Sequence, residues 1–220
     1  MRKRELGNSS KGSADGSDMP IVGTYWRASC ESRAKAAFAI GDREILHRPL
    51  LGLFCSERCP GDLIIKAFDA TTALRDSSVP VISGFHSRVE RECLRILLRG
   101  MQPVVVSPAR SLERMRLPAE WRGPICEGRL LLISPFTANQ SRITAALAAQ
   151  RNEFVVALAR AALVVYADPG GKIETLARRI LQEGKSLFAL DHPSNENLLA
   201  TGARAVGVSE IASVWKATLA

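Results

Sequence analysis

The sequence predicts an α/β fold: a doubly wound, mainly parallel Rossmann-like sheet with helices on both faces. Short apolar segments alternate with longer amphipathic segments from Leu50 to the end of the chain. Strands that alternate with helices in this way form parallel sheets. The apolar segments also lack the regular polar positions of a half-exposed strand, so we expect both of their faces to be covered.

Each element is predicted from its own residues. The predicted strands are apolar runs, and they cover residues 50–55, 79–83, 102–107, 129–134, 162–167 and 186–190. The predicted helices repeat apolar residues at helical spacing, and they cover residues 61–78, 87–100, 140–161 (in one or two pieces), 172–184 and 208–218. Gly100 and Gly184 mark helix ends. The segment from Pro108 to Pro118 is expected to be irregular.

The predicted strands and helices lie within residues 49–220, a segment long enough to form one Rossmann-like domain. Residues 1–19 are rich in Ser, Gly and charged residues, and we expect them to form a disordered arm. Residues 20–48 are expected to be a small irregular or helical lead-in, anchored by Trp26 and Phe38.

The charge of the chain indicates an anionic partner. There are 30 Lys and Arg residues against 22 Asp and Glu residues, a formal net charge of +8. Nucleic acid or a nucleotide is the first candidate, and an ordinary basic surface is the alternative. No apolar run approaches the roughly 20 residues that cross a bilayer, and no signal peptide opens the chain. We therefore expect a cytoplasmic protein without a membrane partner.

The five cysteines predict neither a metal site nor a disulfide framework. Cys55 and Cys59 are four positions apart, but no second pair has the spacing of zinc ligands. We expect free thiols, no metal and no cofactor.

Polar loops follow five of the predicted strands: "CSERCPG", "SGFHSR", "SPARS", "SPFTANQSR" and "DPGGK". Ligands of open parallel sheets bind outside the carboxyl ends of the strands, where the strand order reverses. Helix N-termini at that edge carry partial positive charge. The sequence therefore predicts an anion site on this rim.

The "PGGK" turn is either a phosphate cradle or a simple turn between a strand and a helix. Gly170 and Gly171 allow close approach of the main chain, and Lys172 and Thr175 are able to meet a phosphate. The spaced first glycine and the Lys-Ser/Thr pair of a Walker A loop are missing, and no G-x-G-x-x-G motif occurs in the chain.

Two further pairs of residues are candidates for the rim. Ser87 is expected to cap the helix that follows it, whereas Arg88 opposes the helix dipole and is better explained by an anion. Arg151 and Asn152 precede an apolar run, either as phosphate-binding groups or as part of a solvated helix face.

Catalysis is not predicted. A nucleophile elbow G-x-S-x-G is absent, and no pair of carboxylates stands out. Glu174 is the best single candidate for an acid or base, but a surface glutamate that stabilises its helix N-terminus is the simpler interpretation.

From about Phe38 to Ile211 the chain resembles the DNA-processing protein A (DprA/Smf) family, within the Rossmann-like SLOG group. The segments that carry the resemblance are "IGDREILHRPLLGLFCSERCPG", "VPVISGFHSRVERECLRILLRGMQPVVV" and "RNEFVVALARAALVVYADPGGKIETLARRILQEGKSLFAL". The resemblance implies a Rossmann-like core that binds single-stranded DNA in a basic pocket and helps to load a recombinase. Relatives of this kind often form homo-oligomers.

The resemblance also implies site residues. Those at matching positions are Ser56, Gly84, Arg151, Asn152, Gly171 and Thr175. Two arginines of the family motifs are displaced by one position here, to Arg58 and Arg88, and the third residue of an Arg-Asn-Arg segment is Glu153. The chain thus resembles a divergent member of the family.

Our leading hypothesis is a non-catalytic protein that binds single-stranded DNA. The residues expected at its phosphate-binding rim are Ser56, Arg58, Gly84, Ser87, Arg88, Arg151, Asn152, Gly170, Gly171, Lys172 and Thr175. The alternative is a nucleotide-binding sensor or a nucleotide-cleaving enzyme. "PGGKIETLA" is faintly similar to the P-G-G-x-G-T-x-x-E loop of the LOG phosphoribohydrolases, although Glu174 is not at the position of that family's glutamate.

Overall fold

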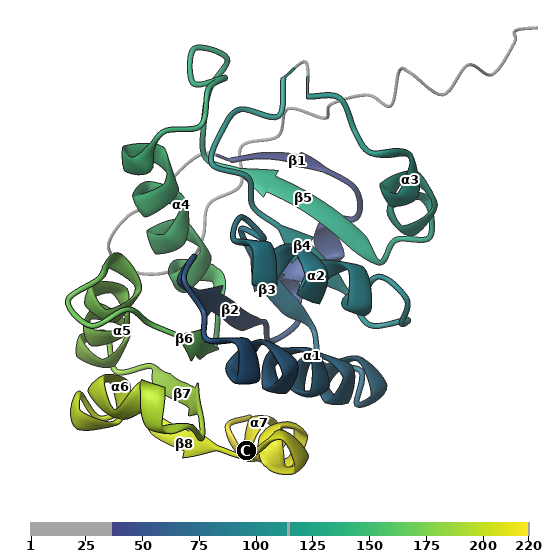
Figure 1. The fold of residues 1–220 in the computed structure, drawn as a ribbon. Helices are drawn as coiled ribbons and strands as arrows, with labels where there is room; N and C mark the ends of the chain where they lie inside the picture. The colour runs from purple at the N-terminus through teal and green to yellow at the C-terminus, as the bar shows by residue number, and fades with distance from the viewer. Residues whose placement is uncertain (1–36, 114, 220) are drawn as a thin grey trace, which may run out of the picture.

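The computed structural model describes residues 37–113 and 115–219. In this part of the chain, eight strands form one sheet in the order β1-β5-β4-β3-β2-β6-β7-β8 (Figure 1). The predicted arm and most of the predicted lead-in, including Trp26, lie outside the described residues. None of the described helices has the length and apolar character that a membrane span requires.

The strands are β1 (Phe38–Ile40), β2 (Leu51–Cys55), β3 (Val81–Ser83), β4 (Val104–Val106), β5 (Leu130–Ser134), β6 (Ala161–Tyr166), β7 (Ser186–Leu190) and β8 (Arg204–Val206). The α-helices are α1 (Gly61–Asp76), α2 (Arg88–Leu97), α3 (Ala119–Cys126), α4 (Ala145–Leu158), α5 (Lys172–Gln182), α6 (Glu196–Ala200) and α7 (Ile211–Ala217). Three short 3-10 helices are η1 (Arg43–His47), η2 (Pro193–Asn195) and η3 (Val208–Glu210).

The sheet is parallel except at one edge, where β1 runs antiparallel to β5. From β2 at the centre the chain moves outward through β3, β4 and β5, and it then returns to place β6 on the other side of β2. The strand order therefore reverses between β2 and β6. This arrangement confirms the predicted doubly wound fold.

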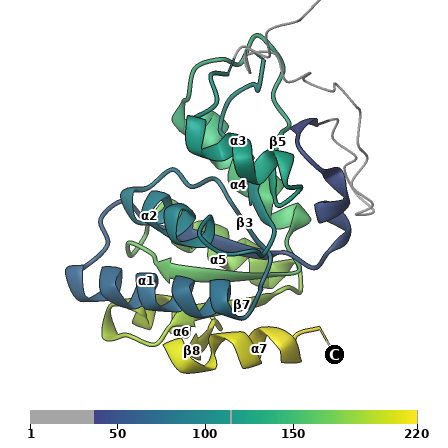
Figure 2. The same cartoon turned by 90° about the vertical axis from the view of Figure 1, so that its right-hand side faces the viewer.

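Two apolar layers cover the sheet, one on each face. Alternate residues of β2 divide between them: Leu51, Leu53 and Cys55 join the layer of α1, α2 and α7, and Phe54 joins that of α4 and α5. Figure 2 shows α1 and α2 on the near side of the sheet. Burial on both faces explains why the strand sequences are apolar throughout.

The structure adds two strands and two α-helices that the sequence pattern did not predict. Strands β1 and β8 extend the two edges of the sheet, and α3 and α6 occupy segments that were expected to be irregular or were left unassigned. Residues 140–161 contain the single helix α4, which begins at Ala145. Phe38, predicted as an anchor of the lead-in, lies in β1 and packs against the core.

Candidate functional site

A cavity of about 530 Å³ lies at the reversal of the strand order, beyond the carboxyl ends of β2 and β6. Its floor is the end of β2 and the loop after it, and its walls are α4 and α5. The lining residues are Cys55, Ser56, Glu57, Ala145, Ala148, Ala149, Asn152, Glu153, Asp168, Lys172, Ile173, Thr175, Leu176 and Arg179. This is the place where open parallel sheets bind ligands.

Small residues on α4 make room for the cavity. Ala145, Ala148 and Ala149 line it, and Asn152 follows one turn later on the same face. Across the cavity, Arg179 of α5 forms an ion pair with Glu153 of α4 over 2.6 Å. The two helices are thus held together beside an open space.

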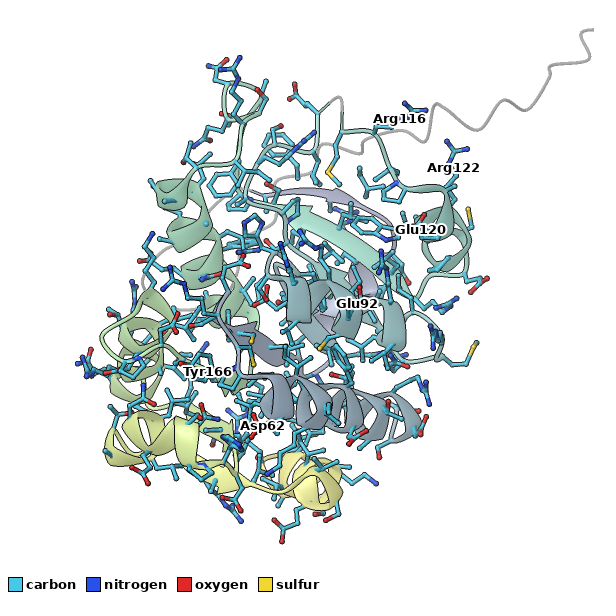
Figure 3. The ribbon with its side chains drawn as sticks, viewed as in Figure 1. Asp62, Glu92, Arg116, Glu120, Arg122 and Tyr166 are labelled. Carbon is cyan, nitrogen blue, oxygen red and sulfur yellow. The ribbon has the colours of Figure 1, made fainter. Side chains whose placement is uncertain are left out.

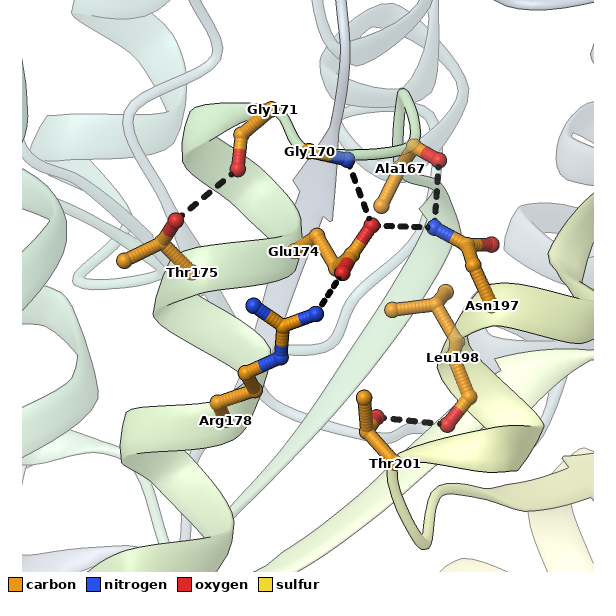
Figure 4. A network of polar contacts seen from close by, with 9 residues as sticks. All are labelled: Ala167, Gly170, Gly171, Glu174, Thr175, Arg178, Asn197, Leu198 and Thr201. Carbon is orange, nitrogen blue, oxygen red and sulfur yellow. Dashed lines mark hydrogen bonds and ion pairs between the residues drawn. The ribbon is translucent and has the colours of Figure 1, made fainter.

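The Gly-rich turn after β6 is held in place by the protein itself. Gly170 has a φ of +69°, which favours glycine, and its N–H donates to Glu174 Oε2 over 2.8 Å (Figure 4). The N–H of Gly171 donates to the carbonyl of Asp168 over 2.8 Å. Both glycine N–H groups are therefore occupied, and the turn itself does not form a phosphate cradle.

The N-terminus of α5 beside this turn is open. Gly171 is its N-cap residue and offers no side chain to the first turn of the helix. Lys172, the first helical residue, lines the cavity and has no side-chain partner among the described residues. An uncapped helix N-terminus next to a lysine favours an anion.

Glu174 connects the turn to α6. Its carboxylate accepts hydrogen bonds from Gly170 and from Asn197 Nδ2, the latter over 2.8 Å, and pairs with Arg178 (Figure 4). The residue is buried, so its interpretation as a surface glutamate is wrong. The hydrogen bonds from Asn197 and Gly170 lower the pKa of Glu174. An ionised carboxylate with these partners serves as a structural link.

Replacing Glu174 with glutamine is expected to remove part of the acid sensitivity of the fold. Because the pKa of Glu174 is lowered in the folded state, the unfolded chain takes up this proton first. The carboxylate thus stabilises the fold fully above its unfolded pKa of about 4.3, and this stabilisation is lost as the pH falls through the folded value. Melting temperatures at pH 7 and pH 4 should differ less in Glu174→Gln than in the parent protein. An unchanged difference would contradict the assignment.

A second carboxylate, that of Glu90, accepts main-chain hydrogen bonds at the ends of β2 and β3. Glu90 Oε1 accepts from the N–H of Cys55 over 2.9 Å, and Oε2 accepts from the N–H groups of His86 and Ser87 over 2.7 and 3.1 Å. Ser87 Oγ accepts in return from the N–H of Glu90, which completes a capping box. The predicted cap at Ser87 is confirmed. The main-chain donors that an external anion would use here are occupied by Glu90.

Arg151 lies behind the rim. Its exposed fraction is 4%, and Nη1 donates to the carbonyl of Ser107 over 3.1 Å. Burial raises the pKa of Glu90 and lowers the pKa of Arg151, and the attraction between the two charges opposes both effects. A Cβ atom at Gly84 would stand 1.0 Å from Arg151 Nη1, so only glycine leaves room for this side chain. Arg151 faces the protein interior instead of solvent.

The predicted rim residues therefore separate into four groups. Ser56, Asn152, Lys172 and Thr175 line the cavity. Gly84, Ser87 and Arg151 form the buried network with Glu90, and Gly170 and Gly171 form the turn. Arg58 and Arg88 are exposed on the same edge of the sheet but do not line the cavity.

Several cavity residues were not predicted. Glu57, Glu153, Asp168 and Arg179 give the lining three carboxylates and, together with Lys172, two cations. The alanines recur at helical spacing, which is a signal that sequence reasoning had available. The carboxylates carried no such signal, because acidic residues were not expected at a basic rim.

A histidine beside this rim also has a structural role. His192 Nε2 lies 2.7 Å from Asp62 Oδ2, and its Nδ1 accepts from the N–H of Ser194 over 3.1 Å. Both ring nitrogens are engaged, so His192 links the start of α1, where Figure 3 labels Asp62, to η2. The hydrogen bond with His192 lowers the pKa of Asp62.

The thiol of Cys55, on the cavity floor, is held in its neutral form. A hydrogen bond with Cys59 and burial raise the pKa of the Cys55 thiol, so it stays protonated. Among residues 37–113 and 115–219, no group of three or more His, Cys, Asp and Glu side chains is placed to hold a metal ion.

Comparison with known proteins fits this geometry. A sequence profile described as DNA recombination-mediator protein A matches residues 26–217. The chain belongs to the DNA recombination-mediator protein A family. The match confirms the resemblance seen in the strand and turn motifs, and it includes every residue of the cavity and of the Glu90 network. No match was found among curated proteins.

Solved structures share the fold of this family member. DNA processing protein A from Streptococcus pneumoniae is 15% identical with a TM-score of 0.69, covering 82% of this chain and 66% of that protein. DNA processing protein A from Helicobacter pylori, in a structure that concerns its single-stranded DNA binding mode, is 18% identical with a TM-score of 0.69, covering 86% and 89%. The molybdenum cofactor carrier protein from Chlamydomonas reinhardtii is 12% identical with a TM-score of 0.55, covering 78% and 99%. At these identities the likeness is one of fold.

Proposed function

We propose that the protein binds single-stranded DNA along the carboxyl edge of its sheet and acts in DNA processing. The observation that carries the proposal is the open N-terminus of α5, with Lys172 at its first position, beside the cavity between β2 and β6. Membership of the DNA recombination-mediator protein A family supports it. So does the similarity in fold to the Helicobacter pylori protein, whose structure concerns single-stranded DNA binding.

The exposed cations of the rim extend this site. Arg58 follows β2, and Arg88 is the first residue of α2 after β3. Both side chains are exposed and make no ion pair with another described residue. Together with Lys172 they offer three positive charges to successive phosphates. The buried Arg151 contributes by shaping the rim. We also propose, as the family suggests, that the protein has a recombinase partner and forms homo-oligomers.

Binding to an oligonucleotide should weaken steeply with salt. Three phosphate contacts on a single strand predict a loss of affinity of about 20-fold between 50 and 200 mM salt, because each contact releases counterions. Fluorescence anisotropy with a labelled oligodeoxythymidine measures this directly. The triple variant Arg58→Ala, Arg88→Ala, Lys172→Ala should bind much more weakly at 50 mM salt and show a flatter salt dependence.

A control variant uses arginines at the amino-terminal ends of the strands, away from the rim. Arg160 precedes β6 and Arg204 begins β8, and both are exposed. The variant Arg160→Ala, Arg204→Ala should retain the affinity and the salt dependence of the parent protein. The proposal fails if the parent protein does not bind at 50 mM salt, or if this control loses as much affinity as the rim variant.

A second candidate function is the binding of a small nucleotide, as a sensor or as a nucleotide-cleaving enzyme. The observation that favours it is the character of the cavity, whose lining contains more carboxylates than cations. Such a lining suits a ligand with hydrogen-bond donors as well as a phosphate.

A further inference from the structure

The cavity between α4 and α5 is lined by both apolar and polar residues. Alanines of α4 and the side chains of Ile173 and Leu176 of α5 give both walls apolar surface. Polar lining residues lie at the strand ends and at Lys172, and others lie on the same two helices: Asn152, Glu153, Thr175 and Arg179. Its volume of about 530 Å³ is within the range of small-molecule sites, roughly 300–1,000 Å³. A cavity with apolar surface on both walls and polar groups beside it suits a flat ring that carries a charged group.

One end of the cavity is suited to a phosphate. The first turn of α5 has no side-chain cap, and the ammonium group of Lys172 is uncommitted among the described residues. Ser56, which is 7% exposed, accepts at its Oγ from the N–H of Asp168 over 3.0 Å. Its hydroxyl hydrogen has no acceptor among the described residues and remains to be donated to a ligand.

The three carboxylates of the lining are not equivalent. Glu153 is paired with Arg179 across the two helices. Asp168 interacts with the hydroxyl of Tyr166, whose pKa is raised by burial and by this carboxylate. Glu57 is exposed, lines the cavity and has no partner among the described residues. It is the one carboxylate of this lining that is free to bind a ligand.

A free carboxylate selects a particular base. Its two oxygens accept only, so they match a ring edge with two adjacent N–H donors. Guanine presents such an edge, with its ring N1–H and its 2-amino group, and adenine does not. Asn152 lines the same cavity without a side-chain partner among the described residues and supplies an amide that can donate to the ring carbonyl.

We propose that the cavity binds one guanine nucleotide, with Lys172 and the start of α5 on its phosphate and Glu57 on its base. This inference rests on the proposed function, because Lys172 binds a phosphate group in both. The nucleotide is either free or the 5′-phosphorylated end of a strand, and the chemistry of the site is the same for both.

Calorimetric titration of the full chain with GMP, AMP and guanosine tests the assignment. GMP is expected to bind about 10- to 100-fold more tightly than AMP, as for one bidentate contact to a base. Guanosine should bind more weakly than GMP because it lacks the phosphate. The variant Glu57→Gln should lose the preference for GMP over AMP, and Lys172→Ala should lose the preference for GMP over guanosine. The control variant Glu120→Gln, on α3 at the position labelled in Figure 3, should match the parent protein.

Two outcomes overturn the inference: equal affinities for GMP and AMP, or no binding of any of these compounds. If oligodeoxythymidine still binds in the second case, the proposed function survives and only this inference fails. If GMP binds but the oligonucleotide does not, this inference survives and the proposed function fails. An oligodeoxythymidine that begins with a 5′-phosphorylated deoxyguanosine should bind more tightly than one without it if the ligand is a strand end. Equal affinity together with GMP binding supports a free nucleotide.

Discussion

Replacing Glu90 with alanine is expected to lower the free energy of unfolding by about 3–5 kcal/mol, a large share of the stability of a domain of this size. The change removes the acceptor of three main-chain N–H groups, at Cys55, His86 and Ser87. It also leaves Arg151 buried without the opposite charge that favours it. Buried donors without acceptors and an uncompensated buried charge are among the costliest defects in a protein interior.

Urea denaturation followed by circular dichroism measures this effect. Glu92→Ala is the matched control, since Glu92 belongs to the same helix but is paired with Arg95 at the surface. Its loss should cost at most about 0.5 kcal/mol. Equal effects of the two substitutions would show that Glu90 does not hold the strand ends together. Glu90→Gln keeps an acceptor of similar shape and should lose less stability than Glu90→Ala.

Replacing Gly84 with alanine is expected to cost about 3 kcal/mol, because the new methyl group takes the space of the Arg151 guanidinium. Arg151 is only 4% exposed, so its side chain cannot avoid the methyl group by moving into solvent. It must shift within the interior, and this shift breaks its hydrogen bond with the carbonyl of Ser107. Gly61→Ala is the control: it begins α1, and a Cβ atom there meets nothing within 4 Å.

A double-mutant cycle separates this steric effect from a general loss of stability. In an Arg151→Ala background the side chain that collides with the methyl group is gone. The cost of Gly84→Ala should then fall to a small fraction of its value in the parent protein. The explanation is wrong if the two substitutions add without interaction.

The fold follows from local patterns for most of its elements. Apolar runs predicted the six longer or central strands, and β7 covers the predicted residues 186–190. The edge strands β1 and β8 were missed. Unlike the equally short central strands β3 and β4, which lie in longer apolar runs, β8 is largely exposed and follows no such run. Helix α3 was missed because it contains Gly123 and Pro124, which are poor helix formers.

The position of the cavity agrees with the rim that the sequence indicated, but only part of its lining was among the predicted residues. Polar loops at the strand ends correctly indicated the edge of the sheet where the cavity lies. The sequence could not show that Arg151 is interior, because its burial depends on Gly84 and Glu90, which are remote in the chain. Acidic lining residues such as Glu57 were overlooked for a different reason: a basic rim was expected, and acidic residues were not sought there.

The central position of β2 has a consequence for synthesis of the protein. Its partner β6 begins at Ala161, so a growing chain emerges from the ribosome with β2 paired on one side only. Until residues 161–166 arrive, the apolar sequence LGLFC presents an open backbone edge, which is a template for aggregation. Fragments that stop before β6 should therefore be insoluble, and reconstitution of the protein from two halves should require both halves to be present during folding.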